Sequence, residues 1–399
     1  MQSRETGAMR YFMALALMVG AAGSPSVFAS PAAQIVNPAN LVIAGNGTRW
    51  EAGVTTARID IDYHRANAVA ASSAGGFDAE TTHAVLPFFA LSHTYNEQWV
   101  LGLAIDMPNY VDIEWGDHTF DVSFAGENLD LMNKGQLKAT RLGPSAAVRW
   151  NERWSFGARV FVQDMYAMEE SDFAKVEGNG IAYGTQLGLR YAGKGYSVGT
   201  AYTTRTLTEV TGTQSNIHPA LAGSLIAGDA RAEILLPARL VTNLAFAVKP
   251  DIWGELEVEW FGWSEFNERT IYQADGTISN RGKNLRSYHD IITTRLGMRW
   301  QKSPGLSLYG AIGYEPTPIP EEDVSPVSNF LRRTRVTMGA AWKFSEDWRL
   351  DTSYQYVRGH SRTVNESTQD SLGGADTDVF EGTYSSTAHA LRVSLSGAF

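Results

Sequence analysis

Several absences narrow the possibilities for this chain of 399 residues. It has no cysteine, which excludes disulfide bonds and zinc sites with cysteine ligands. Acidic residues outnumber basic ones, 43 to 33, for a formal net charge of −10. Because nucleic-acid binding draws on clustered Lys and Arg, we expect no nucleic-acid partner. Beyond the N-terminus, no apolar run approaches the roughly 18 residues of a membrane-spanning helix, which excludes a helical membrane protein.

Patterns of catalysis and metal binding are also missing. The chain has no G-x-S-x-G motif and no Ser/His/Asp grouping on adjacent predicted strands. Its eight histidines are scattered, and those of the second half lack metal-ligand spacing (His218, His289, His360 and His389). We therefore expect no enzyme activity, no metal site and no cofactor.

The N-terminus has the composition of an export signal. Arg4 and Arg10 are basic, and the apolar stretch 11–22 is too short to cross a bilayer. Small residues at Val27 and Ala29 favour cleavage after Ala29. The pattern predicts a signal peptide over 1–29; the alternative is an N-terminal anchor helix.

From residue 49 onward, apolar and polar residues alternate with the period of a β-strand. In the last stretch, Leu391, Val393 and Leu395 share one face, while Arg392 and Ser394 share the other. The same pattern predicts fourteen strands: 49–64, 83–95, 98–108, 135–150, 154–167, 181–192, 196–211, 231–249, 252–266, 287–301, 305–315, 332–345, 348–358 and 383–399.

The connections between these strands alternate between tight turns and long loops. Tight turns such as 151–153 and 345–347 alternate with loops such as 109–134 and 359–382, which is the asymmetry of an outer-membrane barrel. Aromatic residues flank the tight turns, as in the girdle where hydrocarbon meets headgroups: Trp99, Trp150, Trp154, Tyr191, Tyr196, Trp253, Trp300, Trp342 and Trp348. A soluble β-sandwich with tryptophan-rich turns is the alternative, but it would have to bury these rings.

We therefore predict an all-β protein, a 14-stranded antiparallel transmembrane β-barrel over 49–399, in the outer membrane of a Gram-negative bacterium. Its partners would include membrane lipid and lipopolysaccharide, and we expect a monomer. The faces opposite the apolar ones would line a polar lumen, where charged residues pair with one another: Arg141, Arg149, Arg159, Arg190, Arg239, Arg295, Arg299, Arg335 and Arg392, with Glu257, Glu259 and Asp351. So wide a barrel holds a channel, a plug or a ligand.

Several stretches resemble one family. Asn37-Pro38-Ala39 precedes fourteen strands, Leu236-Pro237 precedes a tryptophan-rich strand, and a glycine-tyrosine strand at 308–315 precedes a proline-rich loop. Together they resemble the FadL-type transporters of long-chain fatty acids and hydrocarbons, which include TodX-like proteins. The resemblance covers nearly the whole chain after the signal; no single motif is specific, but their order is.

The resemblance implies passive transport of a hydrophobic molecule. Residues 30–48, with Asn37, Pro38 and Ala39, would form a short plug. The substrate would leave sideways beside the third strand, where Pro108 removes a backbone donor and Trp115 follows. The alternative for Pro108 is an ordinary strand end. The segment before Asn37 and the stretch after strand five are shorter than in the family, which weakens fatty acid as the substrate.

The long loops supply candidate substrate contacts. Two apolar stretches would form an outer catch and a second wall: Phe120, Phe124, Leu129, Leu131 and Met132, then Ile217, Leu221 and Leu225. The second stretch is predicted to be a short helix. Candidate carboxylate contacts are Arg141, Arg159, Arg239 and Arg335. The competing functions are a general porin for polar solutes, favoured by the inward arginines, and an adhesin or structural barrel acting through its loops.

Overall fold

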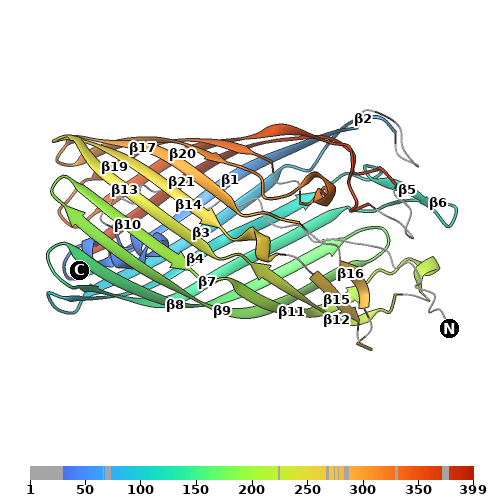
Figure 1. The fold of residues 1–399 in the computed structure, drawn as a ribbon, viewed down its shortest axis with the longest axis horizontal. Coiled ribbons are helices and arrows are strands. Elements are labelled where there is room, and N and C mark those ends of the chain that lie inside the picture. Colours follow the sequence, from blue (N-terminus) through green and yellow to red (C-terminus); the bar gives the residue numbers. More distant parts are fainter. Residues whose placement is uncertain are drawn as a thin grey trace.

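The computed structural model describes residues 30–65, 67, 73–222, 225–266, 269–273, 275–276, 278–282, 287–328, 331–370 and 377–399. The predicted signal peptide, 1–29, lies outside these ranges. The described strands form a closed antiparallel barrel of fourteen strands, and the pairing of the first with the last closes it (Figure 1). The predicted fold class and strand number are therefore confirmed.

Twelve of the fourteen barrel strands are continuous and two are interrupted. In chain order they are β1 (Thr48–Arg65), β3 (Thr82–Thr94), β4 (Trp99–Glu114), β7 (Lys134–Arg149), β8 (Trp154–Glu170), β9 (Lys175–Gly193), β10 (Tyr196–Thr203) continued by β11 (Thr206–Ser215), β12 (Gly228–Leu236) continued by β13 (Arg239–Lys249), β14 (Ile252–Phe261), β17 (Ile291–Ser303), β18 (Leu306–Glu315), β19 (Arg333–Lys343), β20 (Arg349–Val364) and β21 (Gly382–Ala398).

Shorter elements extend or close the barrel. The strands are β2 (Gly75–Asp78), the hairpin β5 (Asp121–Phe124) and β6 (Glu127–Asp130), and β15 (Arg269–Gln273) with β16 (Ile278–Gly282). The helical turns are α1 (Ala33–Val36), η1 (Pro38–Ile43), η2 (Pro219–Leu221), η3 (Trp263–Glu265) and η4 (Glu321–Asp323). Among the described residues, no helix is long and apolar enough to cross a membrane.

Proline accounts for two differences from the predicted strands. Pro237 separates β12 from β13, because its ring nitrogen cannot donate to the ladder. Pro108 does not end its strand as its sequence suggested. Instead β4 continues to Glu114, with a bulge in its pairing to β7 between Asp106 and Asn109.

Three of the tight turns share one hydrogen-bonding pattern. Asn96 Oδ1 accepts the backbone N–H of Trp99 at 2.8 Å, and Asn151 Oδ1 accepts that of Trp154 at 2.9 Å. Ser345 Oγ accepts the N–H of Trp348 at 3.1 Å. A short polar side chain thus closes each turn and starts the next strand at a tryptophan. We call this end of the barrel the turn end and the opposite one the loop end.

The outer surface of the barrel is apolar between two polar limits. Leu296 is 59% exposed near the middle of its strand, and neighbouring strands expose Val160, Ile312 and Met338 in the same way. At the turn end, Trp300 Nε1 donates to Asp251 Oδ2 at 3.0 Å. At the loop end, Trp260 Nε1 donates to Asp290 Oδ2 at 3.1 Å. This apolar band with indole groups at both limits suits a bilayer.

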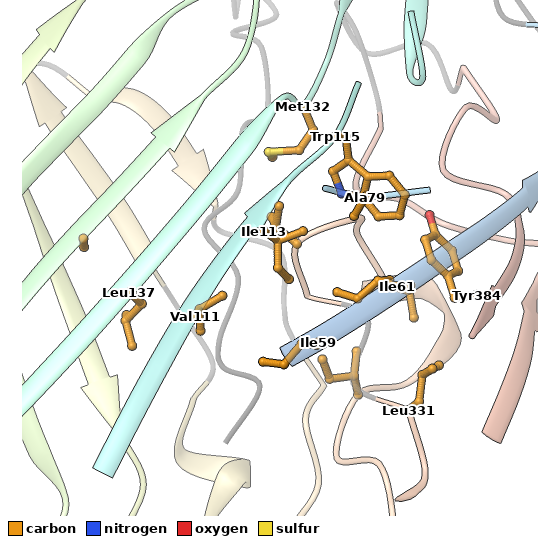
Figure 2. Packing of buried hydrophobic residues seen from close by; sticks show 14 of the residues in the cluster. Ile59, Ile61, Ala79, Val111, Ile113, Trp115, Met132, Leu137, Leu331 and Tyr384 are labelled. Carbon is orange, nitrogen blue, oxygen red and sulfur yellow. The ribbon is translucent and has the colours of Figure 1, made fainter. Parts of the chain in front are cut away.

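The interior has two chemically different halves. At the loop end, inward residues of β1, β4 and β7 join buried loop residues in one apolar cluster, of which Figure 2 shows Ile59, Val111, Trp115, Met132 and Leu137. At the turn end the inward residues are mostly charged or polar. The expectation of a polar lumen throughout was therefore wrong. The loops fold inward, so side chains at the loop end meet protein instead of water.

Candidate functional site

The N-terminal segment, residues 30–47, lies inside the barrel at the turn end (Figure 1). Asn37 is its central anchor. Asn37 Oδ1 accepts the N–H of Ala39 at 2.9 Å and so caps η1, which begins at Pro38. Asn37 Nδ2 donates to the backbone carbonyls of Leu189 at 3.1 Å and Thr200 at 3.2 Å. One side chain thus shapes the segment and attaches it to β9 and β10.

Three glycines on adjacent strands make room for the Asn37-Pro38-Ala39 turn. A Cβ on Gly157 would collide with the backbone of Pro38 and Ala39, and one on Gly188 would collide with Asn37 Oδ1. A Cβ on Gly199 would lie 3.1 Å from Asn37 Nδ2. These glycines let the segment approach the backbone of the wall closely.

Glutamines attach the rest of the segment. Gln34 Nε2 donates to the carbonyl of Leu91 at 3.0 Å, and Ser145 Oγ donates to Gln34 Oε1. From the wall, Gln186 Nε2 donates to the carbonyl of Val36 at 2.9 Å. Because Gln34 and Asn37 are both buried, each of these hydrogen bonds would be costly to leave unmade.

A seam without ladder pairing lies between β3 and β4. Their pairing covers only Phe89–Thr94 with Val100–Ile105. Beyond it, residues 82–88 pair with β1 alone and residues 109–114 pair with β7 alone. The seam begins next to Pro108. It is closed at the loop end, where Thr82 Oγ1 donates to the Asp112 carbonyl and Ala79 bridges to Trp115. The two residues assigned to an exit by resemblance, Pro108 and Trp115, therefore lie at opposite ends of one seam.

A cavity lies between the N-terminal segment and the apolar loop end. Its volume is about 130 Å³, counted as the space that the centre of a water molecule can occupy. Its wall includes Ile35 and Val36 of the segment and Asp106, Pro108 and Asn109 at the seam. The cavity therefore reaches the seam. Its remaining lining is both aromatic and charged, with Phe161 and Phe261 beside several arginine–glutamate pairs.

Most arginines of the cavity are paired with an acid. Arg159 pairs with Asp106 at 2.7 Å and Arg295 with Glu257 at 3.1 Å, while Arg239 contacts Glu259 and Arg335 contacts Glu315. The expected mutual pairing of inward charges is confirmed for these residues. Three of the pairs join adjacent strands, and Arg159–Asp106 passes over β7, so the pairs hold the wall while neutralising one another.

Arg141 differs from the other three predicted carboxylate contacts. Its Nε donates to Gln163 Oε1 at 3.0 Å, and its guanidinium lies 4.6 Å from the centre of the Phe161 ring. Among the described residues, no carboxylate makes an ion pair with Arg141. Of the four arginines, it therefore has the guanidinium most available to a ligand.

Four of the predicted substrate contacts lie inside the loop-end core. Phe120, Leu129, Leu131 and Met132 are buried there with Trp115. The Phe120 ring packs edge-on against Trp115 at 5.2 Å and against Phe380 at 5.3 Å. Their side chains fill the loop end of the barrel and do not line an open rim there.

The other predicted contacts lie nearer the surface. The Phe124 ring lies 5.4 Å from Phe173 and 6.1 Å from His218, while Ile217 and Leu221 are partly buried. Leu225 is buried. The predicted short helix in this loop is the single 3₁₀ turn η2, Pro219–Leu221, capped by His218.

An acidic network supports the loop of Phe120. Asp130 accepts the backbone N–H groups of His118 and Phe120, each at 2.6 Å, and His118 Nδ1 lies 2.8 Å from Asp121 Oδ2. His118, Asp121 and Asp130 have metal-ligand spacing, but these contacts account for them as a support for the loop. Burial raises the pKa of Asp130 to about 6, and nearby Asp121 and Asp172 add to the effect.

Sequence reasoning missed several of these residues. Gly178, Gly180, Gly184 and Gly188 are separated by two or four residues and so share one face of β9, which was a readable signal for close approach to its inner face. Asp106 had no such signal, because its partner Arg159 lies on β8, with β7 in between.

The geometry agrees with comparisons to known proteins. A family model for outer membrane protein transport proteins (OMPP1/FadL/TodX) matches residues 16–399. A solved FadL homologue of Pseudomonas aeruginosa superposes with a TM-score of 0.79 at 16% identity, covering 98% of this chain and 100% of its own. The toluene transporter TodX of P. putida gives 0.71 at 16% identity, covering 98% and 99%.

A third structure, the toluene transporter TbuX of Ralstonia pickettii, gives a TM-score of 0.65 at 15% identity, covering 98% of this chain and 99% of its own. No curated protein shows a significant sequence match. Likeness at such low identity shows the fold alone, whereas the family model matches most of the chain. The chain therefore belongs to the OMPP1/FadL/TodX family of transport proteins and is a β-barrel of the Gram-negative outer membrane.

Proposed function

We propose that this protein carries hydrophobic small molecules, either long-chain fatty acids or aromatic hydrocarbons, passively across the outer membrane and releases them sideways between β3 and β4. The observation that carries the proposal is the unpaired seam beside Pro108, which the internal cavity reaches. An apolar solute leaving there would enter the bilayer without crossing the aqueous periplasm.

The seam has the polarity that such a route needs. On its inner side, Ala84 and Leu86 of β3 and Val111 and Ile113 of β4 belong to the apolar core. On its lipid side, Val85 is exposed. A hydrophobic solute therefore meets apolar side chains on the inner side of the seam and at Val85, while on the outer face of β4 the charge of Asp112 is paired with Lys138. The closed barrel contains the whole route, so a monomer is sufficient.

The N-terminal segment would serve as the plug of this route. It lies on the turn-end side of the cavity, with Ile35 and Val36 in the cavity wall. The anchoring of Asn37 to Leu189 and Thr200 would block the direct path to the periplasm and favour the lateral one. Names of related structures support the substrate classes: two are toluene transporters and one is a FadL homologue.

The test is uptake of labelled oleate and labelled toluene by cells that lack their own fatty-acid channel and produce this protein. We expect uptake of at least one compound, and less of it with Pro108→Ala or Asn37→Ala. Ala84→Trp would fill the seam from inside and reduce uptake, whereas Val393→Trp places the same side chain on the lipid face of β21 and leaves uptake intact. No uptake of either compound by a correctly inserted barrel would refute the proposal.

Arg141 distinguishes the two substrate classes. If a carboxylate binds the one cavity arginine that has no ion pair with the described residues, Arg141→Gln lowers oleate uptake severalfold and leaves toluene uptake unchanged. Equal effects on both compounds would assign Arg141 to the architecture of the wall instead.

A further inference from the structure

We propose that the barrel has a second route, a polar one for small hydrated solutes including ions, which runs beside the N-terminal segment along β13, β14 and β17 with Glu255 at its narrowest level. This route is separate from the hydrophobic one, because it leads towards the turn end instead of to the seam.

The N-terminal segment is attached to only part of the wall. Its hydrogen bonds to the barrel go to β1, β3, β4, β7, β9 and β10, through residues such as Glu51, Leu91, Ser145, Gln186 and Thr200. Within the described ranges, none of its hydrogen bonds reaches β13, β14 or β17. The segment is short, and it leaves this side of the lumen to side chains of the wall.

The side of the lumen that the segment leaves free is charged. Glu255, Glu257 and Glu259 follow one another on the inner face of β14, opposite Arg295 and Arg299 on the inner face of β17. Acidic and basic residues therefore face one another along the lumen here, with the inward rings of Trp253 below them and Phe261 above them. A wall of this kind favours water and hydrated solutes.

Glu255 lies between two cavities, one towards the loop end and one towards the turn end. The upper one is the cavity already described, with Glu257 and Arg295 in its wall. The lower one, of about 330 Å³, is lined by Asn40 and Ile43 of the N-terminal segment and by Asn243, Trp253 and Arg299 of the wall. Since alternate residues of a strand lie roughly 7 Å apart, Glu255 lies about one such step below the upper cavity.

The carboxylate of Glu255 is buried without hydrogen-bond donors in the described part of the chain. It is 5% exposed, and neither carboxylate oxygen has a hydrogen-bond donor among the described residues. In the register of the sheet it lies opposite Gly297, between the levels of Arg295 and Arg299. A buried carboxylate without donors is costly, so water or a passing solute that supplies donors would be stabilised at this level. Small hydrated solutes would then pass this level between the two cavities.

Gly297 provides the means to block this route. A Cβ there would lie 3.6 Å from the Cβ of Glu255 and 3.4 Å from that of Ala311, which are ordinary contact distances. A larger side chain at this position can therefore be accommodated, and it would project into the lumen beside Glu255. Gly310, on the neighbouring strand, offers a matched control. Its partner in the sheet is the lipid-facing Met298, and a Cβ on Gly310 would meet only the Thr337 carbonyl, at 3.4 Å.

The experiment is electrical conductance of the purified full-length protein in planar lipid bilayers, with K⁺ and Cl⁻ as probes. We expect stepwise conductance for the wild type, a loss of about tenfold with Gly297→Phe and a change of less than about twofold with Gly310→Phe. Glu255→Gln should shift the reversal potential in a KCl gradient towards anions, because it removes a negative charge from the narrowest level.

Two results would overturn the proposal: no conductance from the wild type, or the same conductance from wild type and Gly297→Phe. The proposed hydrophobic transport is judged separately, by oleate and toluene uptake with the same variants. Gly297→Phe should leave that uptake unchanged, because Gly297 is remote from the seam between β3 and β4 in the strand order. Either route can therefore fail while the other stands.

Discussion

Arg159 on β8 forms an ion pair with Asp106 on β4 at 2.7 Å, and both side chains are almost fully buried, 2% and 5% exposed. The pair passes over β7 to the last β4 residue before the bulge at Pro108. Arg159 also donates to the carbonyl of Ala104 at 3.1 Å. It therefore holds β4 at the point where this strand separates from β3.

Removing one partner of this pair should strongly destabilise the folded barrel. Asp106→Asn would leave the Arg159 guanidinium buried without its counter-charge, and we expect a loss of about 3–5 kcal/mol in the free energy of unfolding. Denaturant titration in detergent, followed by heat-modifiable mobility on gels, measures it. The double variant Asp106→Asn with Arg159→Gln should recover part of the loss. A loss below about 1 kcal/mol in the single variant would show that the charge is hydrated there.

The glycine contacts of Asn37 predict a way to release the N-terminal segment. Gly188→Ala places a methyl group against Asn37 Oδ1, and the strand backbone is paired on both sides and cannot yield. We expect the segment to leave its site, so that a protease added from the turn end cleaves within residues 30–47. Gly310→Ala, on the lipid face, is the control and should stay resistant. Equal resistance of both variants would mean that the segment tolerates the methyl group.

The apolar band predicts a depth-dependent cost for a charge on the lipid face. Leu296→Arg should destabilise the folded barrel in lipid by about 2–4 kcal/mol, because Leu296 is exposed near the middle of β17. Ile292→Arg lies two residues from Asp290, at the limit of the band, and should cost about 0–1 kcal/mol. Reversible unfolding from phosphatidylcholine vesicles measures both. Similar costs at the two positions would contradict the assigned band.

The acidic network predicts a pH dependence of the loop around Phe120. The pKa of Asp130 is raised to about 6 from an ordinary value of 3.8, mainly by burial. Between these values the folded loop binds more protons than the open one, so its stability falls as pH rises from about 4 through 6. The pKa of His118, raised by Asp121, acts in the same direction as pH rises above about 6.5.

Hydrogen exchange of the Phe120 amide, corrected for intrinsic rates, reports this opening. We expect the greatest protection near pH 4 and a decline up to about pH 6. Asp130→Asn keeps an oxygen acceptor for the N–H of Phe120 but removes the titrating group, and should flatten the profile below pH 6. A profile in Asp130→Asn identical to that of the wild type would remove Asp130 as the cause.

Local sequence determined the parts of this protein that depend on residues close together in the chain. The strand number follows from two-residue periodicity, and the turns follow from Asn96, Asn151 and Ser345, each a few residues before a tryptophan. The aromatic girdle was legible for the same reason, since the preference of a tryptophan for the interface belongs to its own side chain. The prediction was wrong for Trp253, whose ring faces the lumen and lines a cavity at the turn end. The sequence also indicated that the segment around Asn37 has a functional role, through its resemblance to the family.

Only the tertiary structure decided the features that depend on register and on distant strands. The seam exists because β3 and β4 stop pairing after Phe89 and Ile105, and no pattern within either strand shows where a partner is lost. The apolar loop end exists because residues such as Phe120 and Phe380 fold back onto β1. The ion pair of Asp106 and the surroundings of Glu255 likewise depend on how the sheet is sheared as it closes, which brings residues from separate strands to one level of the lumen.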